Sequence, residues 1–267
     1  MNLQDKRVLI TGGTSGIGLA TAEALIAKGA KVFITGRRHD RLVTALEKLR
    51  AGGGYAEGLT ADVATEQGRK FTLRGCIDAL GGLDVLINNA GGVRAGRLED
   101  TTEAEIAAMV TVDLLAPILL TRSALPQLRD GGGMIVNITS AIALIGMPFY
   151  ATYAAVKAGL AHFGEAMRRE LSGKGVHVLT VYPVATDTPM MQSSKAGPEL
   201  GVVREPASAV ANAIARGIET EAFEVIRGGE EREKMIVINR QDPAALDRRF
   251  AEMKPALAEA VRDHSAL

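Results

Sequence analysis

Two side chains that could act together in proton transfer, a tyrosine and a lysine, lie four residues apart in the second half of the chain. Tyr153 and Lys157 belong to an alanine-rich stretch that predicts a helix over residues 152–171, and residues four apart share one face of a helix. An unperturbed tyrosine has a pKa of about 10, which makes it a poor acid–base group near neutral pH. A neighbouring ammonium lowers that pKa by favouring the phenolate, so the pair could protonate a carbonyl that is being reduced.

Ser140 supplies a hydroxyl close to the same place, because it follows a strand predicted over residues 133–138. Its side chain could hydrogen-bond the same carbonyl oxygen. Tyr150 lies nearby but has no lysine four residues later, so Tyr153 is the preferred acid–base group. A tyrosine and a lysine at this spacing also occur by chance on many helices, so the pair alone is weak support for a catalytic site.

A glycine-rich loop near the start of the chain, Thr11-Gly12-Gly13-Thr14-Ser15-Gly16-Ile17-Gly18, predicts a phosphate-binding site. It joins a β-branched run, residues 7–11, to a stretch whose apolar periodicity predicts a helix over residues 17–28. Small residues let the backbone approach a pyrophosphate, and the helix N-terminus offers free N–H groups and the positive end of its dipole. The alternative is a tight turn that needs a left-handed glycine and binds no ligand.

The end of the second predicted strand, residues 31–35, indicates which dinucleotide the loop would hold. In NAD-binding folds, an acidic residue about 20 residues after the loop accepts a hydrogen bond from the ribose 2′-OH. Here Arg37 and Arg38 stand at that place, and guanidinium groups suit a 2′-phosphate through charge-assisted bonds. The two arginines therefore indicate NADP(H) rather than NAD(H), with two solvated arginines at a helix start as the alternative.

These residues fall on a regular alternation of strands and helices. Strands are predicted over residues 7–11, 31–35, 55–61, 84–87, 133–138, 176–182 and 223–227, and helices over 17–28, 38–50, 66–80, 103–128, 152–171 and 206–220. This alternation predicts βαβ units and a parallel sheet in one α/β domain. We expect the catalytic domain to span residues 1–230, with a substrate lid at about 188–205 and a C-terminal helical extension over 231–267. That extension would pack on the same domain or on a partner subunit.

The composition argues against several classes of protein. The 267 residues contain 31 Lys and Arg and 31 Asp and Glu, so the chain lacks the basic excess of a general nucleic-acid binder. One cysteine excludes a disulfide within the chain, and the four scattered histidines show no metal-ligand spacing. The uninterrupted apolar runs are shorter than the roughly 20 residues of a membrane helix, and the N-terminus lacks a signal-like segment. We therefore expect a cytoplasmic protein with no metal, no nucleic acid and no membrane partner.

The motifs, taken in order along the chain, resemble those of the short-chain dehydrogenase/reductase family. Residues 11–18 match the family's TGxxxGxG cofactor loop, and residues 88–91, Asn-Asn-Ala-Gly, match its NNAG motif. Ser140, Tyr153 and Lys157 match its catalytic serine and its YxxxK motif. A match to several motifs in the family's order is far more specific than any one of them.

Two shorter segments extend the resemblance over residues 8 to about 190. Asp62 and Val63 match the pair that holds the adenine, and Pro183 to Thr188 resembles the PGxxxT segment, whose threonine contacts the nicotinamide carboxamide. The cofactor contacts predicted from the loop, the arginines and the resemblance are Gly12, Thr14, Ser15, Gly16, Ile17, Gly18, Arg37, Arg38, Asp62, Val63, Asn89, Ala90, Gly91, Tyr153, Lys157, Pro183 and Thr188.

The resemblance implies a Rossmann-type doubly wound sheet of order 3-2-1-4-5-6-7 and hydride transfer between a nicotinamide and a carbonyl or alcohol. Tyr153 would be the acid–base group, Lys157 would lower its pKa and hold the nicotinamide ribose, and Ser140 would orient the carbonyl. Met190 and Met191 open the lid segment and favour a mainly apolar ketone or secondary alcohol as substrate. Family members are usually dimers or tetramers, so a homodimer or homotetramer is expected.

Two positions depart from the family pattern. Asp113 stands where the family often has an asparagine that takes part in a water-linked proton relay to the lysine. Aspartate keeps an acceptor oxygen but loses the amide donor, and it could pair with Lys157, so we expect activity with an altered pH profile. Val184 replaces the usual glycine after Pro183, which adds bulk beside the nicotinamide and narrows the expected substrate site.

Two alternative functions remain open from the sequence. A non-catalytic dinucleotide sensor or scaffold on the same fold would fit the departures at Asp113 and Val184, although Ser140 and Tyr153 are both present. A sugar-nucleotide epimerase of the extended relatives would be longer, and it would space its glycines as GxxGxxG. The glycine spacing here argues against the epimerase.

Overall fold

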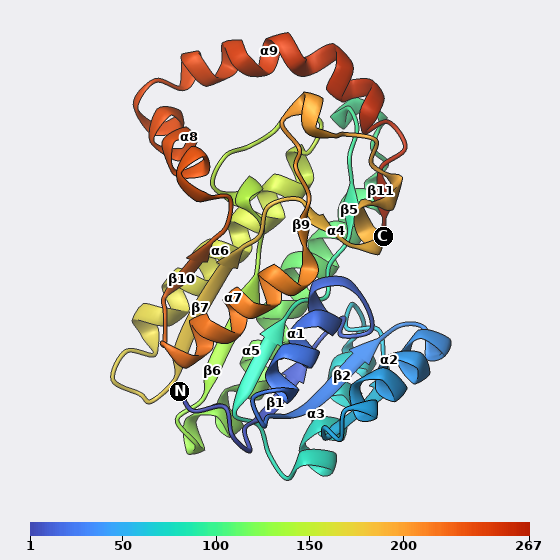
Figure 1. Cartoon of the computed structure of the whole chain (residues 1–267), viewed down its shortest axis with the longest axis vertical. Coiled ribbons are helices and arrows are strands. Elements are labelled where there is room, and N and C mark those ends of the chain that lie inside the picture. Colours follow the sequence, from blue (N-terminus) through green and yellow to red (C-terminus); the bar gives the residue numbers. More distant parts are fainter.

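Seven parallel strands form the centre of the molecule (Figure 1). The structure is a computed structural model that describes all residues from 1 to 267. The strands are β1 (Arg7–Ile10), β2 (Lys31–Gly36), β3 (Ala56–Thr60), β4 (Val85–Asn88), β6 (Met134–Ile138), β7 (His177–Tyr182) and β10 (Glu224–Ile226). Their spatial order is β10-β7-β6-β4-β1-β2-β3. Numbered among themselves along the chain, they have the order 3-2-1-4-5-6-7, which confirms the predicted Rossmann-type sheet.

Helices cover both faces of this sheet and enclose two apolar cores. One face carries α1 (Gly16–Ile26), α2 (His39–Ala51) and α7 (Ala207–Glu219), and the other carries α3 (Glu66–Leu80), α5 (Ala116–Asp130) and α6 (Ala151–Glu170). Val8 and Ile10 belong to the first core and Leu9 to the second, because successive side chains of a strand point to opposite faces. Burial on both faces explains why the strands read as continuous apolar runs.

The long helix predicted over residues 103–128 is interrupted in its middle. It runs as α4 (Glu103–Val110), a π-helical turn (Thr111–Leu115) and α5, and the N–H of Ala116 donates to the Thr111 carbonyl, five residues earlier. Pro117 has no N–H to donate to the Asp113 carbonyl, so the ordinary α-helical ladder cannot continue through this turn. The interruption matters for the site, because Asp113 lies inside it.

The apolar character of this same segment corrects one expectation. By length and composition alone, the helix from Glu103 to Asp130 could cross a membrane, with a mean hydropathy of 1.8 in its most apolar window. Charged and polar residues within this segment keep its uninterrupted apolar runs short, so it was not predicted as a membrane helix. In the fold, α5 packs against α3 and the sheet, and the π turn packs against α6, which accounts for the apolar composition.

The C-terminal part of the chain folds back over the carboxyl ends of the strands. Helices α8 (Gly229–Gln241) and α9 (Pro243–Ala260) arch over the top of the molecule in Figure 1. Leu257 and Val261 are buried in a small third core with Ala95, Ala196 and Leu200. The extension therefore packs on its own chain. Its last residues form a short strand, β11 (Ser265–Ala266), which pairs with β5 (Val93–Arg94) and was not predicted.

The segment predicted as a substrate lid is closed at its base by a second short pairing. Strand β8 (Thr186–Asp187) pairs with β9 (Glu205–Pro206), one at each end of the segment. Between them the chain forms two single turns of 3-10 helix, Pro189–Ser193 and Pro198–Leu200. The lid segment is thus an ordered loop that stands on the sheet beside β7.

Gly18 lies where α1 passes closest to the end of β4. A Cβ atom at this position would stand 2.4 Å from the Gly12 carbonyl oxygen and 2.5 Å from Asn89 Nδ2. Asn89 Nδ2 itself donates to the main-chain oxygens of Thr11 and Gly12, at 2.9 and 3.0 Å. The glycine is required by this close approach of the helix to the loop.

We expect Gly18→Ala to lower the free energy of unfolding by about 1–3 kcal/mol, the usual cost of overpacking. The added methyl group would meet main chain on one side and a hydrogen-bonded amide on the other. Thermal unfolding measures the change, with Gly146→Ala as the matched control because nothing lies within 4 Å of its Cβ position. Equal Tm values for Gly18→Ala and the wild type would contradict this packing.

Candidate active site

The structure brings Ser140, Tyr153 and Lys157 together at the carboxyl end of β6. Ser140 follows this strand, and the other two residues lie one helical turn apart on α6. Lys157 Nζ lies 5.6 Å from the centre of the Tyr153 ring and donates to the Ile138 carbonyl oxygen at 3.2 Å. The Ser140 hydroxyl acts to lower the pKa of Tyr153, and both side chains line the same cavity. The three residues predicted from their spacing therefore share one site.

A fourth residue, Asp113, joins this group from the π turn. Its carboxylate has no exposed surface, the Lys157 side chain is 6% exposed, and Asp113 Oδ1 lies 3.0 Å from Lys157 Nζ. The second oxygen, Asp113 Oδ2, accepts a hydrogen bond from the Gly92 N–H at 3.1 Å. The pairing of Asp113 with Lys157, which the sequence left as an option, is thus present in the structure.

The NNAG loop leaves room for this ion pair. A Cβ atom at Gly91 would stand 2.5 Å from Asp113 Oδ1 and 3.3 Å from Lys157 Nζ. On its other side, the loop is tied to the end of β1, because the N–H groups of Asn89 and Ala90 both donate to Thr11 Oγ1, at 3.0 and 3.1 Å. The loop therefore connects the glycine loop to the acid–base group.

The charges of Asp113 and Lys157 act in opposite directions on Tyr153. Burial raises the pKa of Tyr153 above its ordinary value, the Lys157 ammonium lowers it, and the Asp113 carboxylate raises it. Burial lowers the pKa of Lys157, but the Asp113 carboxylate and Tyr153 together more than offset this, so the pKa of the ammonium is raised. The predicted net lowering of the tyrosine pKa is therefore not found. The lysine acts with the expected sign, but burial and the aspartate outweigh it.

The glycine loop, the end of β2 and the segment after β7 meet in one groove. The Gly13 N–H donates to the Thr35 carbonyl at 2.9 Å. A Cβ atom at Gly36 would stand 2.6 Å from the Thr14 side chain, and one at Gly16 would stand 3.1 Å from that of Thr188. These close approaches bring the loop beside the predicted 2′-phosphate arginines and beside the predicted nicotinamide contact.

The N-terminus of α1 is free to bind an anion in this groove. Gly12 and Gly16 adopt left-handed backbones, with φ of 64° and 55°, which turn the chain from β1 into the helix. The N-cap, Ser15, makes no side-chain hydrogen bond to the helix, and the first turn carries no acidic residue. Exposed N–H groups, a helix dipole and a small-residue loop fit a pyrophosphate.

The remaining predicted contacts lie around the same groove. Asp62 Oδ1 accepts from the Ala64 N–H at 3.0 Å and so shapes the turn after β3 that also contains Val63. The Pro183 carbonyl accepts from the Ala141 N–H at 2.8 Å, which fixes the PVxxxT segment beside Ser140. Ile17, Pro183, Val184 and Thr188 line the cavity that also holds Ser140 and Tyr153.

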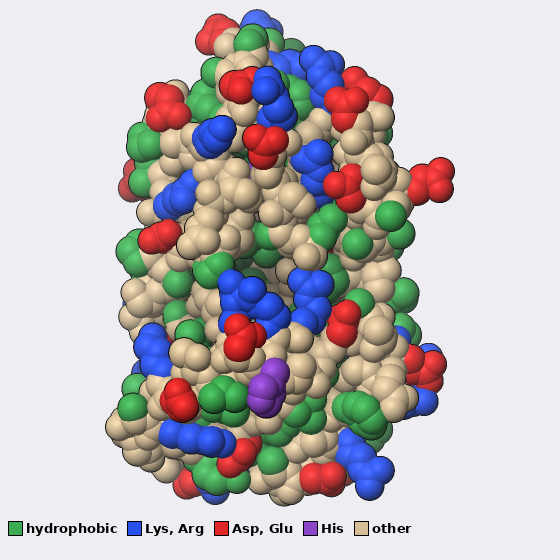
Figure 2. Space-filling view, turned by 90° about the vertical axis from the view of Figure 1, so that its right-hand side faces the viewer, with side chains coloured by type: hydrophobic (Ala, Val, Ile, Leu, Met, Phe, Trp, Pro, Cys, Tyr) green, Lys and Arg blue, Asp and Glu red, His purple; other side chains and the backbone are tan.

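Arg37 and Arg38 are both exposed at the end of β2, but Arg37 already has a partner. One of its guanidinium nitrogens, Nη2, donates to the main-chain oxygen of Leu267 at 3.0 Å. A Cβ atom at Gly92 would stand 3.0 Å from the Ala266 carbonyl oxygen. The last residues of the chain thus lie between the NNAG loop and the arginines, on the side of the molecule where Figure 2 shows Lys and Arg gathered beside a hollow.

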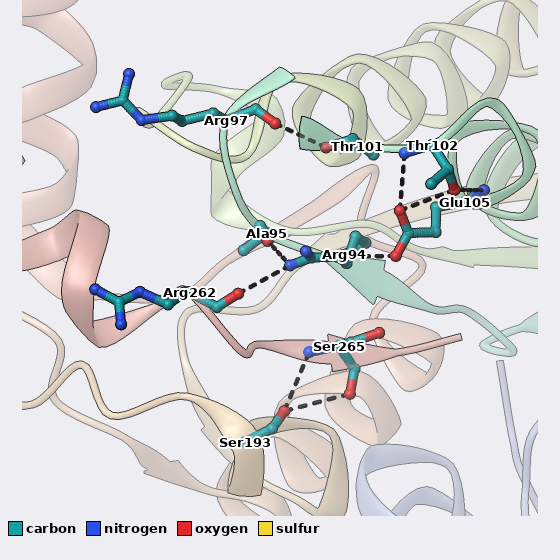
Figure 3. A network of polar contacts seen from close by, with 9 residues as sticks. All are labelled: Arg94, Ala95, Arg97, Thr101, Thr102, Glu105, Ser193, Arg262 and Ser265. Atoms are coloured by element: carbon teal, nitrogen blue, oxygen red, sulfur yellow. Dashed lines mark hydrogen bonds and ion pairs between the residues drawn. The ribbon is translucent and has the colours of Figure 1, made fainter. Parts of the chain in front are cut away.

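The terminal strand also reaches the lid, as Figure 3 shows. Ser193, in the lid, accepts a hydrogen bond from the Ser265 N–H at 3.3 Å, and its hydroxyl is 3.0 Å from His264 Nδ1. On the opposite edge, Arg94 pairs with Glu105 at 3.0 Å and donates to the Arg262 carbonyl at 3.1 Å. Sequence reasoning missed this connection, because a two-residue strand at the end of a helical segment has no periodicity to detect.

A cavity of about 540 Å³ opens beside Ser140 and Tyr153. Most of its lining is apolar, and it includes Met190 and Met191. Val184, which replaces the family's glycine, is also part of the wall. Helices α8 and α9 contribute the far side of the cavity, so the C-terminal extension forms part of its wall.

The chain belongs to the short chain dehydrogenase family, whose family model matches residues 6–199. It is 36% identical over 227 residues to a ketoacyl reductase of Nostoc sp., which covers 84% of this chain and 79% of that protein. It is 34% identical over 224 residues to a 3-oxoacyl-(acyl-carrier-protein) reductase of Vibrio cholerae, covering 79% of this chain and 90% of the relative.

A solved structure extends the similarity to the whole fold. A short chain dehydrogenase from Burkholderia cenocepacia, in complex with NADP, has a TM-score of 0.80 and 33% identity, covering 86% of this chain and 98% of that one. Family membership together with these relatives makes the protein an oxidoreductase that acts on C=O or CH–OH groups.

Asp113→Asn removes the negative charge beside Lys157 with little change of shape. Because that charge raises the pKa of Tyr153, its loss is expected to lower this pKa. Carbonyl reduction uses the protonated tyrosine and is lost as pH rises through this pKa, so its alkaline limb should move to lower pH. The pH dependence of kcat/KM in both directions measures the shift.

The matched control is Asp130→Asn, at the exposed end of α5, which should leave the profile in place. For alcohol oxidation, which uses the phenolate, the rising limb should move to lower pH by the same amount. A profile of Asp113→Asn that coincides with the wild type in both directions would show that Asp113 does not tune Tyr153.

Proposed function

We propose that the protein is an NADP(H)-dependent oxidoreductase that transfers a hydride between the nicotinamide and a mainly apolar ketone or secondary alcohol. The observation that carries the proposal is the buried series Asp113, Lys157, Tyr153 and Ser140, which ends in an apolar cavity beside the glycine groove. The relatives named as ketoacyl reductases support the reaction class, and the structure in complex with NADP supports the cofactor.

Tyr153 acts as the proton donor in the direction of reduction. Its hydroxyl gives a proton to the carbonyl oxygen, while the Ser140 hydroxyl donates a hydrogen bond to the same atom. The Lys157 ammonium stabilises the phenolate that remains, and Asp113 keeps that ammonium charged and in place. The dinucleotide, when bound, supplies the hydride, and in oxidation the proton returns to the phenolate.

The groove would hold the dinucleotide along the residues predicted for it. The glycine loop and the N-terminus of α1 would take the pyrophosphate, and Asp62 and Val63 would lie at the adenine. Arg37 and Arg38 would bind the 2′-phosphate, and Thr188, against Gly16, would contact the carboxamide. The Leu267 oxygen that Arg37 now contacts would yield to the phosphate, a stronger acceptor.

We also propose an oligomeric state, a cellular location and a substrate class for the enzyme. A homodimer or homotetramer is supported by Val110 and Leu115, which are about 40% exposed on the otherwise apolar segment between α4 and α5. We propose that the enzyme works in the cytoplasm on a small-molecule carbonyl or alcohol, without nucleic acid. The apolar lining of the cavity supports the substrate class.

Tyr153→Phe removes the proton donor and keeps the ring. We expect kcat to fall by about 10²- to 10⁴-fold, the usual contribution of a general acid, while the Kd for NADPH changes little. Ketone reduction followed by NADPH consumption, over a panel of apolar ketones, measures the loss. Tyr150→Phe is the matched control, because Tyr150 lines the same cavity but has no lysine behind it. Comparable activity of Tyr153→Phe and the wild type would remove Tyr153 from the mechanism.

Arg37→Ala tests the cofactor preference. We expect the Kd for NADPH to rise about tenfold or more, since a hydrogen bond to a charged group contributes about 1.5–3 kcal/mol. The Kd for NADH, which lacks the 2′-phosphate, should change little. Titration of the protein with both dinucleotides measures this, and Arg38→Ala apportions the effect between the two arginines. A wild-type preference for NADH would refute the proposal.

A further inference from the structure

Arg232 stands out among the partly buried arginines of this chain because its guanidinium has no partner. It lies on the first turn of α8, is half-buried, and lines the substrate cavity without an ion pair or a hydrogen bond. Every other partly buried arginine is engaged: Arg7 with Asp84, Arg69 with Val63, Arg94 with Glu105, Arg168 with the Phe223 ring, Arg204 with Ser194, and Arg227 with Glu205. Among the partly buried arginines, Arg232 is thus the exception.

The backbone places Arg232 close to the segment that borders Ser140. Gly228, the N-cap of α8, has φ 103°, and a Cβ atom there would stand 2.9 Å from Val184 Cγ1 and 3.0 Å from Arg232 Cβ. Val184 directly follows Pro183, whose carbonyl is hydrogen-bonded to the residue after Ser140. The stem of Arg232 thus begins beside the segment that borders the catalytic serine.

The charge of the cavity wall is not balanced within the protein. The charged side chains that line it are Glu231, Arg232 and Arg249, which sum to one positive charge. Glu231 is exposed and pairs with Arg249 at 3.6 Å; its charge acts on Arg232, but it makes no ion pair or hydrogen bond with that guanidinium. His264 adds no charge near neutral pH, because burial lowers its pKa to about 4. Burial also lowers the pKa of Arg232, because a charged guanidinium is less well solvated in this half-buried position than in water.

We propose that Arg232 binds a carboxylate on the substrate, so that the enzyme acts on oxo acids or hydroxy acids whose acidic group is separated from the reacting carbon by an apolar chain. This inference rests on the proposed function of the same cavity. A guanidinium binds a carboxylate through two parallel hydrogen bonds, and one free positive charge matches a monoanion. A phosphate dianion would leave one negative charge uncompensated in a mostly apolar cavity.

The activity test compares acids with their esters. Straight-chain oxooctanoates with the ketone at successive positions are reduced with NADPH, each beside its methyl ester. The wild type is expected to prefer at least one acid by about tenfold or more in kcat/KM, as expected for a charged hydrogen bond. Arg232→Gln should remove the preference by lowering the rate on the acid alone, and Arg232→Lys should retain part of it. Arg240→Gln, on the same helix but outside the cavity, should retain all of it.

A binding measurement separates this inference from the proposed function. Calorimetry with octanoate and octanamide, in the presence of NADPH, reports on Arg232 even if no ketone is turned over. Tighter binding of octanoate than of octanamide, lost in Arg232→Gln, supports the carboxylate site. Equal binding of the two probes, or an Arg232→Gln variant that loses acid and ester activity equally, overturns it. Turnover of esters that depends on Tyr153 but not on Arg232 upholds the proposed function alone.

Discussion

The buried ion pair between Asp113 and Lys157 is the interaction on which the rest of the site depends. Two charges 3.0 Å apart in the interior are stable only together, because removing one partner of such a pair typically costs about 3–5 kcal/mol. The π turn places the aspartate, Gly91 leaves space for it, the Gly92 N–H satisfies its second oxygen, and the Ile138 carbonyl holds the ammonium. The lysine behind the tyrosine is therefore fixed by three segments outside its own helix: the π turn, the NNAG loop and the end of β6.

The same ion pair also affects the pKa of Tyr153. A lysine alone would lower the pKa of the tyrosine, but here the carboxylate and burial act against it and leave that pKa raised. A tyrosine with a raised pKa is fully protonated near neutral pH, which is the form that donates to a carbonyl. An asparagine at position 113 would carry no charge and could not have this effect. The aspartate therefore makes the electrostatic surroundings of Tyr153 different from those beside an asparagine.

The sequence alone predicted the parts of the fold and of the site that are marked by short motifs. The strand order was predicted from the family resemblance, and the glycine loop and the grouping of Ser140, Tyr153 and Lys157 were predicted from motifs of fixed spacing. The π turn could not be predicted from apolar periodicity, which continues through it, although Pro117 gave a signal in hindsight. The raised tyrosine pKa depends on burial, and the strand at residues 265–266 depends on a partner about 170 residues earlier. Neither is encoded locally.

The residues proposed for catalysis and the residues proposed for substrate specificity lie in different parts of the chain. The family model ends at residue 199, and every catalytic residue proposed here lies before that point. The far wall of the cavity comes from α8 and α9, beyond the matched region, and its unpartnered Arg232 lies there. Helix α8 packs against α9 and has no fully buried residue, so its cavity-lining side chains can differ without disturbing the buried residues around Tyr153. Similarity to ketoacyl reductases therefore supports the reaction class. The chemical group that is bound at the other end of the substrate must be inferred from this chain's own C-terminal residues.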